Sequence, residues 1–172
     1  MITVVTPTVA GREDLLKECI ASVKAAGFPH LIGADPQHLG PAVVRNKLLE
    51  SVRTPWVVFL DDDDLLYPQY QRIVEKRFKD ADVIYTAWDL TGGEEPKPRP
   101  FDADLLRRGN YIPVTACVRT EAIRSVGGFP EDWVLEDHGL WIRLLDAGYR
   151  FTYVPVIGWV YRRQPGSRTE AA

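Results

Sequence analysis

The sequence is poor in the residues that staple or anchor small proteins. It contains two cysteines, Cys19 and Cys117, too few for a disulfide framework, and we expect both to be reduced, buried thiols. It has three histidines, and the spacing of His30 and His38 does not suggest a zinc site. The longest clean apolar run, residues 56–60, is far too short to cross a bilayer. These scarcities argue against a disulfide scaffold, a zinc site and a membrane span.

The N-terminus and the charge balance narrow the class further. The opening Met-Ile-Thr-Val-Val-Thr-Pro has no basic segment and no cleavage pattern, so we expect no signal peptide and a soluble, cytoplasmic protein. Lys and Arg number 21 and Asp and Glu 24, and the net charge of −3 disfavours a general nucleic-acid or anionic-membrane binder. A length of 172 residues, 45% apolar and 26% charged, suits one globular domain.

Hydrophobic periodicity predicts alternating strands and helices over the first half of the chain. Strands are expected at 2–6, 30–34, 56–60 and 83–87, and helices at 12–26, 41–52 and 68–78. This order predicts a parallel sheet with helices on both faces, in which ligands bind beyond the carboxyl ends of the strands. The second half predicts helices near 102–108, 120–126 and 136–147, and strands near 115–119, 151–154 and 158–162. Residues 92–100, rich in Pro and Gly, are expected to form a loop.

Four consecutive carboxylates, Asp61 to Asp64, follow the third predicted strand. Adjacent carboxylates repel one another, and the first of them lies at the edge of the apolar core, where an uncompensated charge costs stability. A solvated acidic turn with a helix N-cap is the simpler alternative. A hard divalent cation would relieve the repulsion, and Mg²⁺ is usually held by one or two carboxylates together with substrate phosphates. The position after a buried strand therefore favours a metal–diphosphate site.

Three blocks of sequence, taken in chain order, carry a family resemblance. The first is Arg45-Asn46, followed by the apolar strand at 56–60 and an Asp-x-Asp pattern within 61–64. The second is the Gly-Gly-Phe turn at 127–129, followed by Glu136-Asp137 at the head of a predicted helix. The third covers 154–162. Together these blocks resemble the core signature, the acceptor-side motif and the closing strands of family 2 glycosyltransferases of the GT-A fold.

The resemblance implies an α/β protein of the GT-A type, with a Rossmann-like, mostly parallel sheet, helices on both faces and a small acceptor-side half. Residues 1–172 would form a single domain, in which 1–90 bind the nucleotide sugar, 101–165 form the acceptor and catalytic half, and 166–172 are a flexible tail. The implied activity is metal-dependent, inverting transfer of a sugar from a nucleotide-diphosphate donor to an acceptor hydroxyl, with Mn²⁺ or Mg²⁺ as cofactor. A UDP-sugar is favoured as donor, GDP- and dTDP-sugars are alternatives, and the acceptor is unknown.

On the donor side, the Asp-x-Asp pair carried over from the family is Asp61 and Asp63. Asp63 would coordinate the metal, and Asp61 would contact the ribose or a metal-bound water. A run of four leaves the register open by one residue, so Asp62 is a further nucleotide-side candidate. The other nucleotide-sugar candidates are Thr6, Pro7, Thr8, Asp35, Arg45 and Arg162. An ordinary turn residue is an equal alternative for Asp35, and a surface cation on an amphipathic helix is the alternative for Arg45.

On the acceptor side, Asp137 is the candidate general base, because a carboxylate within reach of the acceptor hydroxyl can take its proton. Its place at a helix N-terminus favours the ionised form. Glu136 would hold the acceptor, Trp133 is a candidate platform for a sugar ring, and His138 is a further candidate acceptor contact. Simple helix capping is the alternative for the acidic pair.

The sequence departs from the family pattern at two points. Gln164 stands where the family often carries a His that contacts the metal or diphosphate, and Pro-Gln-His-Leu-Gly follows Asp35 in place of the usual turn. Two other functions therefore stay open. One is a nucleotidyltransferase, which would normally have a glycine-rich, basic phosphate-binding loop near the N-terminus. Residues 9–12 are only an incomplete version of such a loop. The other is a catalytically silent nucleotide-sugar-binding module.

Overall fold

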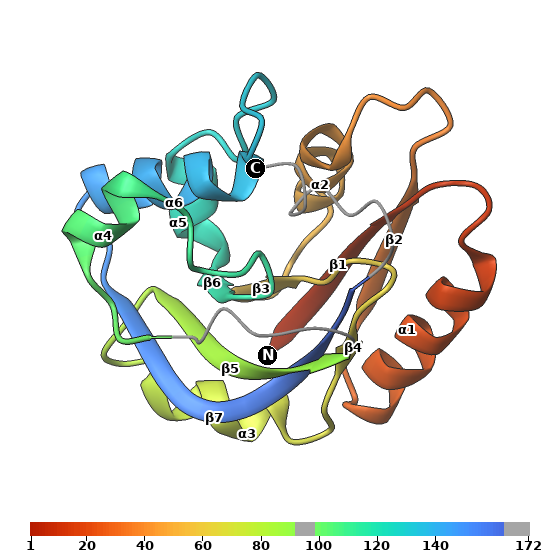
Figure 1. The fold of residues 1–172 in the computed structure, drawn as a ribbon, viewed down its shortest axis with the longest axis horizontal. Coiled ribbons are helices and arrows are strands. Elements are labelled where there is room, and N and C mark those ends of the chain that lie inside the picture. Colours follow the sequence, from red (N-terminus) through yellow and green to blue (C-terminus); the bar gives the residue numbers. More distant parts are fainter. Residues whose placement is uncertain (92–98, 164–172) are drawn as a thin grey trace.

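The computed structural model describes residues 1–91 and 99–163, which form a curled sheet of seven strands with helices against both faces (Figure 1). The strands are β1 Ile2–Thr8, β2 His30–Ala34, β3 Trp56–Phe59, β4 Leu65–Leu66, β5 Val83–Thr91, β6 Cys117–Arg119 and β7 Phe151–Arg162. The helices are α1 Glu13–Ala25, α2 Pro41–Leu49, α3 Tyr70–Val74, the 3₁₀ turn η1 Glu75–Arg77, α4 Ala103–Arg108, α5 Thr120–Ser125 and α6 Glu136–Asp146. Most of the predicted 92–100 loop, Gln164 and the predicted tail lie outside the described residues.

The first three strands are parallel, as predicted. β1 is parallel to β2 on one side and to β3 on the other. Since the three strands run the same way, their carboxyl ends meet at one edge of the sheet. At this edge the chain passes through Thr8, Asp35 and the acidic run that begins at Asp61.

The predicted α/β class is confirmed, but the sheet is not parallel throughout. The strand order is β2-β1-β3-β6-β5-β7-β4. β6 lies between β3 and β5 and is antiparallel to both, and β4 is antiparallel to β7. β5 and β7 are parallel to each other. The helix–strand alternation could not indicate this arrangement, because β6 comes from the second half of the chain and enters the sheet through long-range pairing.

Several elements also differ from the prediction in their length. The two strands predicted at 151–154 and 158–162 form one strand, β7, whose register beside β5 shifts around Ala87. Pro155 lies at this irregularity, where its missing N–H cannot join the ladder. The helix predicted at 68–78 is reduced to α3 and η1, and the two-residue strand β4 was not predicted.

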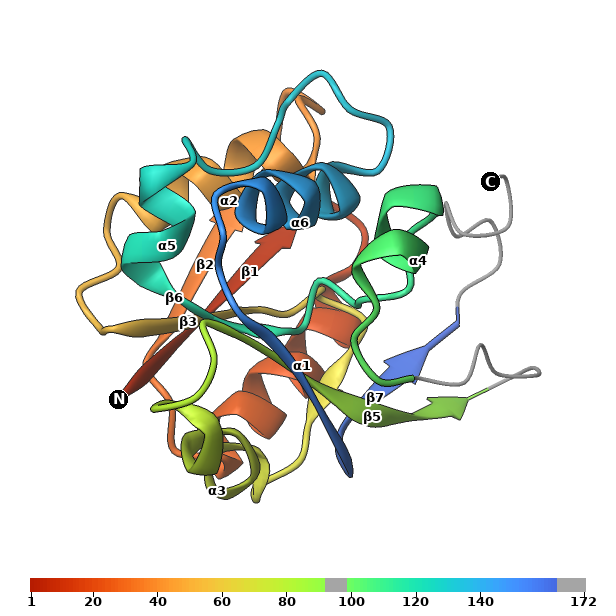
Figure 2. The ribbon, with the colours of Figure 1, turned by 90° about the vertical axis from the view of Figure 1, so that its left-hand side faces the viewer.

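Alternate residues of the strands pack into two cores, one on each face of the sheet. Val4 and Val58 belong to the core that α1 and α3 cover, whereas Val5 and Phe59 belong to the core under α2, α4, α5 and α6. Figures 1 and 2 show these two layers of helices. Trp141 of α6 is fully buried, and its indole N–H donates to the Ile112 carbonyl at 3.0 Å. The helix that begins with the acceptor-side motif, α6, is thus anchored through Trp141 in the core on this face of the sheet.

The predictions for the cysteines agree with the structure. Cys19 and Cys117 are both free and buried. Burial raises the pKa of the Cys19 thiol to about 12, so this group is protonated at neutral pH. Among the helices of the described residues, none combines the length and the apolar character that crossing a membrane would demand.

A single asparagine fastens α2 to the turn that leads to the acceptor-side motif. The Asn46 amide donates to the Phe129 carbonyl at 2.9 Å and accepts from the Phe129 N–H at 2.8 Å. Gly128 precedes this turn with a φ of 76°, and a Cβ atom there would lie 2.5 Å from the Asn46 Oδ1 atom. Glycine at position 128 is therefore required by backbone conformation and by close approach to Asn46.

We expect Gly128→Ala to destabilise the protein. The substitution combines an unfavourable φ with a clash against Asn46, and we expect it to lower the free energy of unfolding by about 1–3 kcal/mol. Gly109→Ala is the matched control, because Gly109 has a φ of 177° and open space around its Cβ position. Chemical denaturation of both variants measures the difference. Equal stability of the two variants would contradict this account of the turn.

Candidate functional site at the carboxyl ends of the strands

A cavity of about 800 Å³ lies at the carboxyl ends of β1, β2 and β3. The predicted site residues in its walls are Pro7, Thr8, Asp35, Arg45, Asp61, Asp62, Asp63, Glu136, Asp137 and Arg162. Among the described residues, seven carboxylates and four arginines line the cavity, a formal excess of three negative charges. The cavity therefore has the charge of a site that accepts a cation.

Arg45 joins the two halves of the cavity. Its guanidinium group is 1% exposed and bonds to Asp61 Oδ1 at 2.5 Å and to Glu136 Oε1 at 2.6 Å. It also lies over the Phe129 ring, 5.4 Å from the ring centroid. Arg45 is thus no surface cation: it is a buried bridge from the end of β3 to the first turn of α6.

Asp62 and Asp63 share a second arginine, Arg12. The Arg12 Nε atom lies 3.0 Å from Asp62 Oδ1, and its terminal nitrogen pairs with Asp63 Oδ2. The other Asp62 oxygen accepts from the Thr8 hydroxyl at 2.6 Å. Asp62 is therefore held by Thr8 and Arg12 against the end of β1.

Asp64 is the most deeply buried of the four carboxylates, at 2% exposure. Its Oδ1 atom accepts from the Arg162 backbone N–H at 2.9 Å. Burial first, and then the charge of Asp61, raise the pKa of Asp64 well above its usual value. Burial also raises the pKa of Asp62 and of Asp63. A positive charge placed among these groups would favour their ionised forms.

Three of the four carboxylates can converge on one cation. Asp61, Asp63 and Asp64 each offer an oxygen, and these oxygens lie within 4.8 Å of one another. A set of carboxylate oxygens suits a hard divalent ion such as Mg²⁺ or Mn²⁺. The cluster contains the predicted pair, Asp61 and Asp63, together with Asp64, which the run alone left open.

Asp35 lies in the cavity wall at the end of β2 and holds its own loop together. Its two carboxylate oxygens accept from the backbone N–H groups of Leu39 at 2.9 Å and Gly40 at 2.7 Å. These bonds, that of Leu39 first, lower the pKa of Asp35, so it is ionised at neutral pH. The loop after Asp35, whose sequence departs from the family pattern, is thereby fixed beside the cavity.

Asp137 faces the cavity from the first turn of α6. Its Oδ2 atom accepts from the Asn110 amide at 2.8 Å, and its Oδ1 atom accepts from the His138 backbone N–H at 2.8 Å. Burial first, and then the charge of Glu136, raise the pKa of Asp137. The helix N-terminus was expected to favour ionisation, but burial outweighs it. A raised pKa makes the carboxylate a stronger base.

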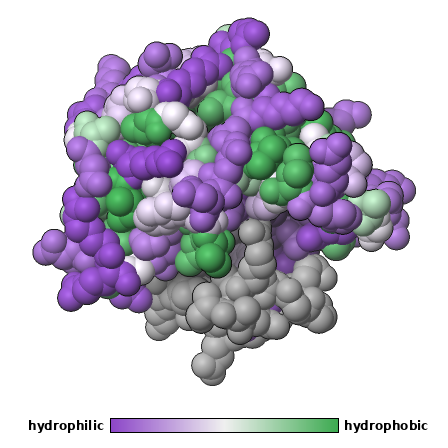
Figure 3. Space-filling model, turned by 90° about the horizontal axis from the view of Figure 1, so that it is seen from above, coloured by the Kyte–Doolittle hydropathy of each residue, from purple (hydrophilic) through white to green (hydrophobic). Residues whose placement is uncertain are grey.

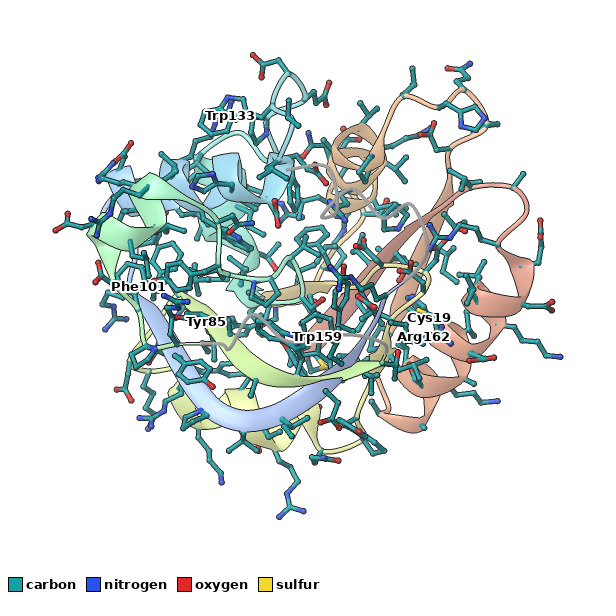
Figure 4. The ribbon with its side chains drawn as sticks, in the orientation of Figure 1. Cys19, Tyr85, Phe101, Trp133, Trp159 and Arg162 are labelled. Atoms are coloured by element: carbon teal, nitrogen blue, oxygen red, sulfur yellow. The ribbon has the colours of Figure 1, made fainter. Side chains whose placement is uncertain are left out.

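Three predicted residues lie elsewhere in the structure. Thr6 is fully buried, and its hydroxyl lies 2.8 Å from the Nε2 atom of His30, whose pKa burial lowers to about 4. Trp133 is 46% exposed, packs edge-on against the His138 ring and stands apart from Trp159 and Arg162 (Figure 4). The Nε2 atom of His138 is 2.7 Å from the Leu106 carbonyl of α4. Within the described chain, these three side chains are outside the cavity lining.

The side chain of Arg162 is directed at α1 rather than across the cavity. Its guanidinium group pairs with Glu18 and with the Asp63 carbonyl, and it donates to the Leu15 carbonyl at 3.3 Å. Figure 4 shows Arg162 on the side of the molecule that carries α1. In this arrangement Arg162 fixes the acidic run to α1 and β7.

Other cavity residues were not predicted as site residues from the sequence. In the sequence, Arg12 stands out only as part of an incomplete phosphate-binding loop at residues 9–12. Asn110 lies in a stretch without a recognisable motif. Trp88 and Trp159 line the cavity and pack together with ring centroids 5.6 Å apart. Seen from above, the face around α2 and α6 is mainly hydrophilic with separate apolar patches (Figure 3). No single pattern in the sequence marks the contacts of Arg12, Asn110, Trp88 and Trp159, because each contact joins segments that are distant in the chain.

Two curated relatives match the sequence. A pre-mycofactocin glycosyltransferase of Mycobacterium tuberculosis is 35% identical over 140 residues, which cover 70% of this chain and 30% of that protein. The uncharacterized protein y4gI of Sinorhizobium fredii is 26% identical over 208 residues, which cover 97% of this chain and 23% of that protein. The chain thus spans less than a third of the length of either relative.

Solved structures share the fold. S. aureus TarS 1-349 in complex with UDP-GlcNAc matches with a TM-score of 0.78 and 15% identity, over 99% of this chain and 61% of that chain. The mannosyltransferase PcManGT from Pyrobaculum calidifontis, in complex with GDP-Man and Mn²⁺, matches with a TM-score of 0.74 and 16% identity, over 99% and 59%. The predicted GT-A fold is therefore confirmed.

The family itself follows from the sequence. The model of glycosyl transferase family 2 matches residues 34–127, a stretch that contains Asp35, Arg45 and the whole acidic run. This match covers more than half of the 172 residues, and the chain belongs to glycosyl transferase family 2.

Proposed function

We propose that this protein transfers a sugar from a nucleotide-diphosphate donor to an acceptor hydroxyl, with inversion at the anomeric carbon. The observation that carries the proposal is the pairing of two groups in one cavity: the convergent carboxylates Asp61, Asp63 and Asp64, and the separate carboxylate Asp137. The first group suits a cation that holds a diphosphate, and the second suits a base that activates an acceptor. Membership of glycosyl transferase family 2 supports this combination.

Asp61, Asp63 and Asp64 would hold a divalent cation, Mn²⁺ or Mg²⁺. When bound, the cation supplies the positive charge that stabilises the leaving diphosphate. Arg45 fixes Asp61 through one oxygen, Oδ1, and leaves its second oxygen for the cation. The presence of Mn²⁺ in the PcManGT complex, a structure with the same fold, supports this choice of metal.

The nucleotide would lie along the ends of β1 and β2. Pro7, Thr8 and Asp35 line this part of the cavity, and the ionised Asp35 would accept an N–H of the base. A UDP-sugar is our favoured donor, with GDP- and dTDP-sugars as alternatives. The structural relatives support a nucleotide sugar in general, since TarS 1-349 was solved with UDP-GlcNAc and PcManGT with GDP-Man.

Asp137 would act as the general base for the acceptor. The Asn110 amide and the His138 N–H orient its carboxylate, and its raised pKa strengthens it as a proton acceptor. A single base that activates a hydroxyl for in-line attack displaces the diphosphate from the opposite face, which inverts the anomeric centre. Glu136 is bound to Arg45, so we assign it to holding the site and not to proton transfer.

The matched stretch covers 30% of one relative and 23% of the other. The division into a donor half, 1–90, and an acceptor half, 101–165, remains a prediction. The acceptor itself is unknown.

A panel of nucleotide sugars with Mn²⁺ tests the proposal directly. We expect at least one donor to release its nucleotide diphosphate, and we expect chelation of the metal to stop the release. Binding of a donor without any release would instead identify a silent binding module. Release of pyrophosphate from a nucleoside triphosphate would identify a nucleotidyltransferase.

We expect Asp63→Asn to weaken metal-dependent binding of the nucleotide. Loss of one charged ligand should raise the Kd of UDP or GDP in Mn²⁺ at least about tenfold, or about 1.4 kcal/mol. Asp80→Asn, which changes an exposed aspartate in the turn after η1, is the matched control and should leave the Kd unchanged. Isothermal titration calorimetry measures both variants. An unchanged Kd for Asp63→Asn would rule out Asp63 as a ligand.

We expect Asp137→Asn to reduce turnover strongly while the donor still binds. Removal of a general base should lower kcat about 10²- to 10⁴-fold. In the wild type, kcat should rise with pH as Asp137 loses its proton. Because burial raises the pKa of Asp137, this rise should come at a higher pH than for an ordinary aspartate, whose pKa is 3.8. The variant should lack this limb of the profile. Asp146→Asn, at the other end of α6, should keep both rate and profile, and a fully active Asp137→Asn would refute the assignment.

A further inference from the structure

We propose that Arg12 is an exchangeable counter-ion of the acidic run: it pairs with Asp63 when no cation is bound, and it pairs with the donor diphosphate once a cation takes Asp63. The inference rests on the proposed function and adds a diphosphate-binding residue to the site residues predicted for a glycosyltransferase.

The position of Arg12 allows such an exchange. Arg12 immediately precedes α1, and Gly11 before it has a φ of 86°, which turns the chain so that the next side chain reaches the end of β3. Arg12 lines the cavity, and its side chain is 33% exposed, in contrast to Arg45 at 1%. Arg12 is therefore partly open to the cavity, whereas Arg45 is enclosed by protein.

The present partners of Arg12 are unequal. Asp62 has a second partner, the Thr8 hydroxyl at 2.6 Å, so it stays anchored if Arg12 leaves. Asp63 is different. Within the described residues, its carboxylate forms its ion pair with Arg12. The Arg12 Nε–H finds no hydrogen-bond acceptor within the described chain, although Nε lies 3.0 Å from Asp62 Oδ1. The contact of Arg12 with Asp62 is thus an ion pair without an aligned Nε–H hydrogen bond.

A cation and Arg12 compete for the same carboxylate. Asp63 is one of the three residues whose oxygens converge within 4.8 Å. A divalent ion bound there would repel the guanidinium that now occupies Asp63 Oδ2. A diphosphate on that ion would in turn present anionic oxygens beside Arg12, and guanidinium groups bind phosphate oxygens through paired hydrogen bonds. The exchange keeps both the carboxylate and the arginine paired in each state.

The test uses Arg12→Gln and two ligands, Mn²⁺ alone and UDP or GDP in saturating Mn²⁺. We expect the variant to bind Mn²⁺ alone about three- to tenfold more tightly, because the competing cation is gone. We expect it to bind the nucleotide about tenfold more weakly, because a charged contact to phosphate is lost. The opposite signs distinguish exchange from a general loss of structure, which would weaken both.

Arg107→Gln is the matched control. Arg107 of α4 is 50% exposed and pairs with Asp146 of α6 at 2.7 Å. Within the described residues, it is not part of the cavity lining. We expect neither affinity to change in this variant. A change of both affinities in the same direction in Arg12→Gln, or of neither, would overturn the inference while leaving the proposed function intact. A wild type that binds neither Mn²⁺ nor nucleotide would overturn both.

A measurement on the wild type does not depend on the folding of a variant. In a ¹⁵N-arginine-labelled sample, the Nε–H resonance of Arg12 should shift on addition of Mg²⁺ alone and shift again on addition of UDP or GDP. The Arg107 resonance should stay in place. An Arg12 resonance that ignores Mg²⁺ would contradict the exchange.

Discussion

The buried guanidinium of Arg45 is the interaction on which the site depends. It holds Asp61 at the end of β3 and Glu136 at the head of α6, two residues that are 75 positions apart in the chain. A charge at 1% exposure is tolerated only because both carboxylates and the Phe129 ring surround it. Since Glu136 adjoins Asp137, the same bridge sets the distance between the acidic run and the candidate base. Asn46, the next residue, reinforces the link through its bonds to Phe129.

The remaining charges of the cavity follow from this bridge. Arg45 is shared between two carboxylates and Arg12 between two more, which leaves the cavity lining with an excess of negative charge. Burial raises the pKa of Asp62, Asp63 and Asp64, which means that ionising these groups without a cation costs free energy. A divalent ion would relieve that cost and bring the diphosphate with it. The burial and the convergence of these carboxylates favour the proposed cation site over a solvated turn.

Local patterns predicted the parts of this site, and long-range packing decided how they combine. The strand β3 and the run after it were evident because an apolar stretch ends abruptly in carboxylates, and β2 was predicted at its observed bounds. The sequence could not indicate that β6 separates β3 from β5, since that pairing joins residues about 60 positions apart. Nor could it indicate that Thr6 would face His30, or that Trp133 would pack on His138. Asn110 and Arg12 reach the site only through the fold.

The account rests on the claim that Asp61, Asp63 and Asp64 hold a divalent cation while Arg45 keeps its two partners. An anomalous-difference map from a crystal grown with Mn²⁺ and UDP or GDP tests this claim most directly. We predict one Mn²⁺ peak among these three carboxylates, in contact with a phosphate oxygen, with Arg45 still bonded to Asp61 and Glu136. A peak elsewhere in the cavity, or a nucleotide bound without metal at these residues, would contradict it.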